Sequence, residues 1–164
     1  EDEAFVISGN LLNKGIRGIL VNSRAKSLVF LHTYLLNKTD LIGKEEFEKD
    51  STVEKEDESK QQKGSNADTV CYYVIKYKDG SKEKVAVTYG KTICYWKAGF
   101  YGNIKAPDAN PVFVGITQFG IPYIICSQEW VNPKPELEIE KIDIEHPSEY
   151  LHEGIALFAI TAVI

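Results

Sequence analysis

The residues of this chain that could do chemistry are aromatic rings and side-chain amides placed near turns. An exposed ring can stack on the C–H face of a pyranose, while amides and carboxylates bind the sugar hydroxyls. The aromatic candidates are Trp96, Phe100, Tyr101 and Trp130, and their polar partners are Asn103, Asp108 and Asn132. For a sugar ligand we predict stacking on Trp96, Tyr101 and Trp130, with hydrogen bonds from Asn103 and Asn132. The alternative is that the tryptophans belong to the core and that the other rings anchor their loop.

Signatures of catalysis are missing from the sequence. Glycoside hydrolysis needs two facing carboxylates, whereas the acidic residues concentrate in one charged segment and at solvent-facing strand positions. The chain has no G-x-S-x-G motif, no phosphate-cradling glycine loop and no histidine cluster. We therefore predict a protein that is not an enzyme and has no cofactor. The alternative is a structural calcium ion, bound by oxygens of a loop such as 108–110.

The histidines and cysteines give weak signals. His32, His146 and His152 are spread along the chain. His32 ends an apolar run, so we predict a hydrogen-bonded structural residue there, with a ligand contact as the alternative. Cys71, Cys94 and Cys126 each lie in an apolar, strand-like run without metal-type spacing. We predict three buried free thiols; the alternative is one disulfide and one free thiol.

Composition limits the classes of partner. The chain has 164 residues and a net charge of −5, which argues against nucleic acid, because phosphate contacts need clustered Lys and Arg. No apolar run is as long as a membrane span. The sequence contains no methionine. We therefore expect a processed chain or a piece of a larger protein.

A β-hairpin over residues 70–88 is predicted to organise the fold. Asp79-Gly80 separates two alternating β-prone runs, the pattern typical of a two-residue type I′ turn. In that register the opposite pairs are Lys76 with Glu83, Val74 with Val85, and Tyr72 with Val87. The four hydrophobic residues of these pairs would share one face, with an ion pair near the tip.

The remaining sequence predicts further short strands. Their ranges are 5–7, 16–21, 27–33, 92–96, 112–117, 123–126, 137–145 and 155–164. Gly18 indicates a bulge or a close backbone approach, and a change of phase among the apolar residues predicts a second bulge at Glu140-Lys141. The apolar last strand should be central and covered on both faces.

The predicted domain is single, 1–164, with one insertion. Residues 44–67 are mostly charged or polar, which is typical of a solvated loop. An interaction segment is the alternative reading. The fold class predicted from these patterns is all-β, an antiparallel β-sandwich (jelly roll) of about eight or nine strands.

Five segments in this order resemble one group of proteins. They are Ser27-Leu-Val-Phe-Leu-His-Thr33, Tyr73-Val-Ile-Lys-Tyr-Lys-Asp-Gly-Ser81, Ile93-Cys-Tyr-Trp96, Trp130-Val-Asn-Pro-Lys-Pro135 and Ala156-Leu-Phe-Ala-Ile-Thr161. Together they resemble the galactose-binding-domain-like β-sandwich modules appended to bacterial glycoside hydrolases. The resemblance implies a non-catalytic jelly roll, often carbohydrate-binding and sometimes holding calcium. It carries over no sugar-binding residue by motif.

The expected function is therefore a non-catalytic carbohydrate-binding or accessory module of a secreted polysaccharide-acting system. Its expected location is extracellular or at the cell surface, and its expected partners are a glycan and a neighbouring domain or subunit. The alternative is a structural subunit of an extracellular assembly. Such a subunit would pack through its apolar C-terminal strand or through a sheet edge.

Overall fold

The computed structural model describes residues 5–8, 15–35, 69–97, 106–147 and 154–164. Every regular element in these ranges is a strand. The strands are β1 (Phe5–Ser8), β2 (Ile16–Ser23), β3 (Ser27–Leu35), β4 (Thr69–Tyr77), β5 (Lys82–Thr88), β6 (Asn110–Ile116), β7 (Pro122–Val131), β8 (Ile139–Glu145) and β9 (Gly154–Val163). The predicted insertion, 44–67, lies outside the described residues.

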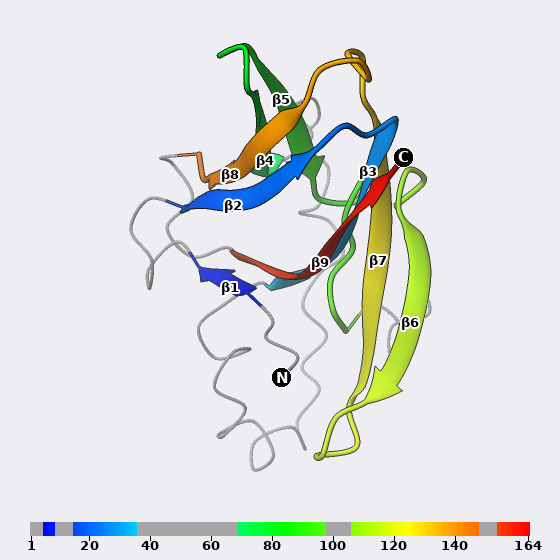
Figure 1. Ribbon diagram of the computed structural model, residues 1–164. Helices are drawn as coiled ribbons and strands as arrows, with labels where there is room; N and C mark the ends of the chain where they lie inside the picture. The colour runs from blue at the N-terminus through cyan, green and yellow to red at the C-terminus, as the bar shows by residue number, and fades with distance from the viewer. Residues whose placement is uncertain (1–4, 9–14, 36–68, 98–105, 148–153) are drawn as a thin grey trace.

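The strands form two antiparallel sheets that pack as a sandwich (Figure 1). The five-stranded sheet has the order β1-β9-β3-β7-β6, and the four-stranded sheet has the order β2-β8-β4-β5. From β1 to β4, and again from β7 to β9, each successive strand crosses to the other sheet. This alternation is that of a jelly roll, with β6 added at one edge, and it confirms the predicted all-β sandwich.

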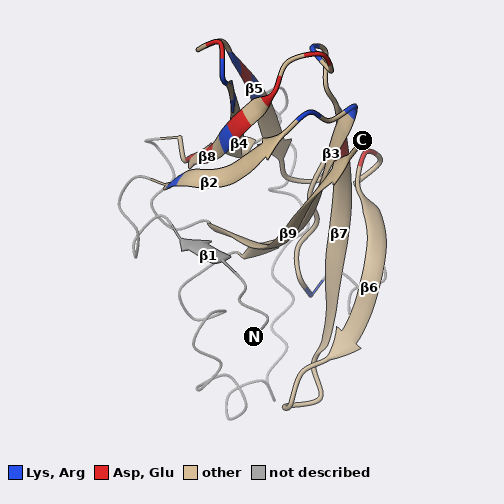
Figure 2. Ribbon diagram, in the orientation of Figure 1, with Lys and Arg blue, Asp and Glu red and all other residues tan. Residues whose placement is uncertain are grey.

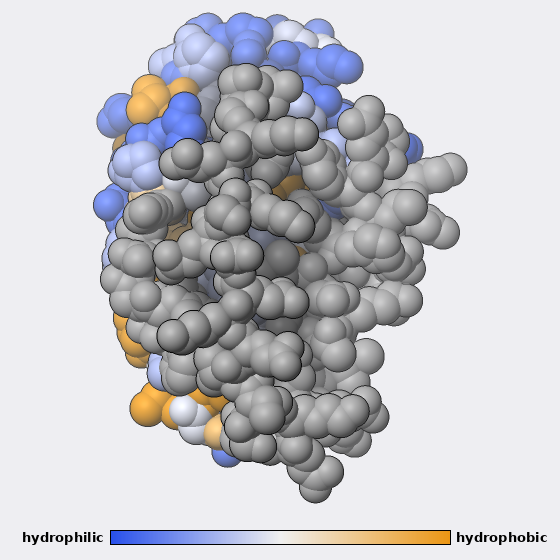
Figure 3. Space-filling model, turned by 180° about the vertical axis from the view of Figure 1, so that it is seen from behind, coloured by the Kyte–Doolittle hydropathy of each residue, from blue (hydrophilic) through white to orange (hydrophobic). Residues whose placement is uncertain are grey.

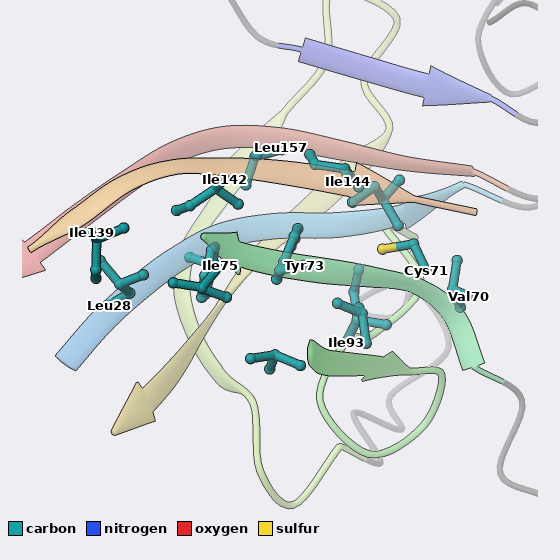
Figure 4. Packing of buried hydrophobic residues seen from close by; sticks show 14 of the residues in the cluster. Leu28, Val70, Cys71, Tyr73, Ile75, Ile93, Ile139, Ile142, Ile144 and Leu157 are labelled. Atoms are coloured by element: carbon teal, nitrogen blue, oxygen red, sulfur yellow. The ribbon is translucent and has the colours of Figure 1, made fainter. Parts of the chain in front are cut away.

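The core lies between the sheets and is built from alternating inward-facing residues (Figure 4). β3 contributes Leu28 and Phe30, and the Phe30 ring stacks on Tyr73 of β4 with 4.1 Å between centroids. The fully buried isoleucines include Ile75, Ile93, Ile139, Ile142, Ile144 and Ile155. Each buried side chain of this size contributes about 1.5–3 kcal/mol. The two sheets are therefore held together mainly by hydrophobic burial.

The predicted hairpin is confirmed, but its predicted register is wrong by one residue. β4 and β5 pair with Tyr73 opposite Val85 and Cys71 opposite Val87. The loop has three residues, because the Tyr77 N–H donates to the Ser81 carbonyl. A slip of one residue places the alternate set of β4 side chains on the face that carries Val85 and Val87. The core face consequently carries Cys71, Tyr73, Ile75, Tyr77, Val85 and Val87.

Both predicted bulges are confirmed. The register of β2 against β8 shifts between Ile16 and Ile19, where Gly18 has a φ of +80°. β8 shifts against β4 between Ile139 and Lys141, so that the extra residue is Glu140. Because of this extra residue, Ile139, Ile142 and Ile144 all reach the core, although their sequence numbers differ in parity.

The C-terminal strand lies inside the five-stranded sheet, as predicted. β9 pairs with β1 on one side and with β3 on the other. Residues 154–157 are buried, whereas Phe158 and Val163 are exposed. The prediction that both faces of this strand are covered is thus wrong for its second half, which extends beyond β1 and has exposed side chains.

Candidate functional site

A short segment, Cys94–Trp96, is inserted between β3 and β7. These two strands pair as far as His32 opposite Cys126. Beyond that point the Tyr34 N–H donates to the Cys94 carbonyl (2.9 Å) and the Trp96 N–H to the Tyr34 carbonyl (3.1 Å). On the other side the Ile124 N–H donates to the Trp96 carbonyl (2.8 Å). The predicted strand at 92–96 is therefore reduced to this inserted segment, which forms only isolated bridges.

A disulfide fixes the inserted segment to β7. Cys94 is bonded to Cys126, and a small hydrophobic cluster of Ala106, Ala109 and Ile124 surrounds the pair. The prediction of three free thiols is wrong for these two residues; one disulfide with one free thiol is the observed state. Pairing depends on spatial proximity, which the spacing of the cysteines does not reveal. Cys71 remains a buried free thiol, and burial raises the pKa of this group and keeps it unreactive.

Four aromatic residues, which we call the aromatic end, gather where β3 ends: Tyr34, Tyr89, Tyr95 and Trp96. The rings of Tyr34 and Tyr89 lie 4.7 Å apart, and Tyr95 meets Trp96 edge-on at 6.3 Å. Tyr89 is 42% exposed, and partial burial raises its pKa. Tyr89 and Tyr95 were missed by sequence reasoning, although the position of Tyr89 beside Gly90 could have indicated an aromatic residue at a turn.

Trp96 has a buried polar atom without a partner. Its indole N–H finds no acceptor among the described residues, although the side chain is only partly buried. The Lys97 ammonium lies 4.8 Å from the centroid of the ring. The indole N–H can donate a hydrogen bond, but it is buried and not accessible to a ligand in this structure. Tyr101 and Asn103, predicted to bind with Trp96, lie outside the described residues, and their roles stay predictions.

The other two predicted ligand residues lie at the opposite end of β7. Trp130 is six residues beyond Ile124, which neighbours Trp96, and six residues of extended strand span about 20 Å. Trp130 packs against the main core. Asn132 accepts hydrogen bonds from the Tyr77 hydroxyl and the Lys134 N–H, and its amide donates to two carbonyls. All of its capacity is used within the chain, so its geometry is that of a structural residue.

His32 is a buried structural residue, in agreement with the sequence prediction. Its Nε2 lies 3.1 Å from the Thr92 carbonyl, and its Nδ1 lies 2.7 Å from the Tyr73 hydroxyl. A carbonyl can only accept, so Nε2 carries the proton and Nδ1 accepts from the hydroxyl. Burial lowers the pKa of His32 to about 4, against a smaller opposing effect of the Thr92 hydrogen bond. The ring is therefore neutral at physiological pH.

Charged side chains in the described ranges form pairs rather than a metal centre. Asp143 is buried and lies 2.5 Å from the Lys76 ammonium, and it also accepts from the Gly18 N–H. Burial raises its pKa, but these hydrogen bonds outweigh burial and the net shift is downward. Asp108, named in the calcium alternative, lies 3.8 Å from Lys91. No group of three or more His, Cys, Asp or Glu that could hold a metal ion is found within the described ranges.

The fold defines the class of this protein as an antiparallel β-sandwich of the jelly-roll type. Comparison with models of known protein families found no match. Comparisons with curated proteins and with solved structures found no match either. Within the described residues, no helix is long and apolar enough to cross a membrane.

Proposed function

We propose that the chain is a non-catalytic accessory module of an extracellular, polysaccharide-acting system and that it binds carbohydrate at the aromatic end. The observation that carries this proposal is the exposed ring of Tyr89, which packs against Tyr34 at the aromatic end. Jelly rolls bind ligands at the ends of their strands, where the connecting loops lie close together. An exposed tyrosine ring provides a surface on which a sugar can stack.

Two features of the described residues support this assignment. The Cys94–Cys126 disulfide is typical of proteins that fold in an oxidising compartment, such as the outside of the cell. The same bond, with the main-chain hydrogen bonds of Trp96, holds the start of the predicted binding loop in place. A rigid anchor lowers the entropy lost when a flexible ligand binds.

The proposal is tested by glycan binding of matched aromatic variants. Tyr89→Ala removes a stacking ring, and we expect a loss of affinity of about two- to tenfold, because a ring contributes ~0.5–1.5 kcal/mol beyond its area. Tyr101→Ala tests the predicted loop in the same way. Phe119→Ala, an exposed ring in the β6–β7 turn, is the control and should leave affinity unchanged. Titration of tryptophan fluorescence, after a glycan array has selected the ligand, measures the change.

The proposal fails if the glycan array finds no ligand for the wild-type chain. It also fails if Tyr89→Ala and Tyr101→Ala both bind as tightly as wild type. Thermal melting of each variant separates loss of binding from loss of fold. Because Tyr89 is partly exposed, its replacement should move the melting temperature little.

A second candidate function is a structural subunit of an extracellular assembly. One observation favours it: β6 forms an edge of the five-stranded sheet, and most of its hydrophobic side chains are exposed. Exposed apolar sheet edges are sites at which another strand can pair.

A further inference from the structure

Most of the β6–β7 hairpin carries no charge. Between Asp108 and Glu129 no residue is Lys, Arg, Asp or Glu, although 26% of the chain is charged. In Figure 2, β6 is uncoloured along its whole length, whereas charges gather around β4, β5 and β8. A solvent-exposed strand normally carries charges that keep it soluble and unpaired. β6 is therefore an exposed edge strand without the charges that usually protect one.

The side chains of this edge are exposed on both faces of the sheet. The exposed hydrophobic residues of β6 and the following turn are Val112, Phe113, Val114, Ile116 and Phe119. Phe113 lies opposite Ile125, and Val114 lies opposite Ile124, so the two point to opposite faces. Seen from behind in Figure 3, hydrophobic atoms lie along the side of the molecule where β6 runs.

Both edges of the four-stranded sheet are protected. β5, an edge of the four-stranded sheet, carries Lys82, Glu83 and Lys84. β2, the opposite edge of that sheet, carries Arg17, and its Gly18 bulge breaks the regular ladder. Charges and bulges of this kind prevent edge-to-edge pairing. In β6 a bulge falls only at Val112, and the strand from Phe113 to Ile116 keeps a regular ladder.

We propose that β6 pairs with β6 of a second copy of this chain, antiparallel across a two-fold axis. The two five-stranded sheets would then form one continuous ten-stranded sheet. This inference gives the second candidate function a partner and does not depend on sugar binding.

The distribution of charge favours a second copy of this chain, rather than a different protein, as the partner of β6. In a two-fold interface each surface meets itself, so any charge at the axis would face a like charge. The chain has a net charge of −5, which repels a second copy in general. The uncharged hairpin is a surface where two copies can approach without that repulsion. Antiparallel pairing of identical strands is also symmetric and satisfies the outward-facing N–H and C=O groups of both strands.

The available area is sufficient for a small dimer. At about 150–200 Å² for a fully exposed side chain, the exposed parts of the five hydrophobic residues amount to roughly 500 Å². The backbone of the strand adds to this value. The total approaches the ~600–1,000 Å² that each partner buries in a specific interface.

The test is the oligomeric state of matched lysine variants. Val114 and Ile116 are 64% and 72% exposed, and Leu20 of β2 is 70% exposed on the other sheet. Light scattering after size exclusion, from ~1 to ~100 μM, should give twice the chain mass for wild type and for Leu20→Lys. Val114→Lys and Ile116→Lys should give the mass of one chain, with unchanged circular dichroism. A monomeric wild type at ~100 μM, or a Leu20→Lys variant that dissociates equally, would overturn the proposal.

Cysteine cross-linking tests the pairing itself. When two seven-residue strands overlap fully, their central residue, Phe113, lies on the two-fold axis opposite its own copy. Opposite Cβ atoms are about 4.5–5.5 Å apart, close to the reach of a disulfide. Phe113→Cys should therefore form a covalent dimer on a non-reducing gel, and Leu20→Cys should not. Equal cross-linking of both variants, or none in either, contradicts the pairing. A glycan titration of the Val114→Lys monomer tests sugar binding independently of dimer formation.

Discussion

Acidification should destabilise this protein through one residue, His32. The ring is buried between the Tyr73 hydroxyl and the Thr92 carbonyl and is neutral. Protonation of Nδ1 would place a buried positive charge there, and the Tyr73 hydroxyl would lose its acceptor. In the unfolded chain the imidazole titrates normally, near pH 6.5. Between pH 6.5 and about 4 the imidazole therefore binds a proton in the unfolded state but not in the folded state.

The magnitude follows from the two pKa values. Burial lowers the pKa of His32 from 6.5 to about 4, which at about 1.4 kcal/mol for each unit corresponds to roughly 3 kcal/mol. Because the pKa of the folded state is the lower one, this stability is fully present above pH 6.5. It is lost as the pH falls towards 4, with a slope of about 1.4 kcal/mol per pH unit in the middle of that range.

Urea unfolding at pH 7, 6, 5 and 4 measures this loss. His32→Gln is the matched variant, because an amide can accept from Tyr73 and donate to Thr92 without titrating. Other acidic groups contribute equally to both proteins and cancel in the difference. The free energy of wild type should fall relative to the variant by roughly 3 kcal/mol between pH 7 and 4. Parallel pH profiles for the two proteins would refute the assignment of a neutral, buried His32.

Two further predictions concern residues that tie the chain together. Reduction of the Cys94–Cys126 disulfide, which spans 32 residues of sequence, should lower the free energy of unfolding by about 4 kcal/mol; urea midpoints with and without dithiothreitol measure this. Asn132→Ala removes the acceptor of the Tyr77 hydroxyl and the donor to the Ala25 carbonyl. It should cost about 2–4 kcal/mol, measured by urea unfolding.

Each of these predictions has an internal control. The double variant Cys94→Ala/Cys126→Ala should be insensitive to dithiothreitol, and an equal response to the reductant in both proteins would contradict the first. Asn110→Ala, at an exposed position on β6, should change stability by less than about 0.5 kcal/mol. If Asn132→Ala is as mild as this control, the hydrogen bonds of Asn132 do not stabilise the fold.

The hairpin shows what sequence patterns can determine. Asp79-Gly80 correctly predicted where the chain reverses, because Gly80 takes a φ of +87°. The pattern could not determine the loop length, because the same dipeptide serves both two-residue and three-residue loops. Residues on both faces of β4 are apolar, so hydrophobicity did not choose between the two registers. The bulge at Glu140 was predictable because in β8 the apolar residues change phase.

The candidate site was less predictable than the fold. Trp96 and Trp130 look alike in sequence, since each ends a strand-like run, yet one borders the aromatic end and the other packs on the core. Asn132 precedes a proline and resembles a loop residue. Its side-chain oxygen, however, accepts a hydrogen bond from the hydroxyl of Tyr77, 55 positions earlier. Such contacts between distant segments decide which polar groups remain available for a ligand. Local patterns do not contain them.

The insertion of residues 94–96 between β3 and β7 has a consequence for how this domain can diversify. The main chain of Trp96 is hydrogen-bonded to β3 and β7, the Asp108 N–H donates to the Lys91 carbonyl, and Cys94 is held covalently. The stretch between these anchors can be exchanged or lengthened at little cost, because loop-closure entropy grows slowly with length. The sequence between these anchors can thus change while the β-sandwich keeps its structure.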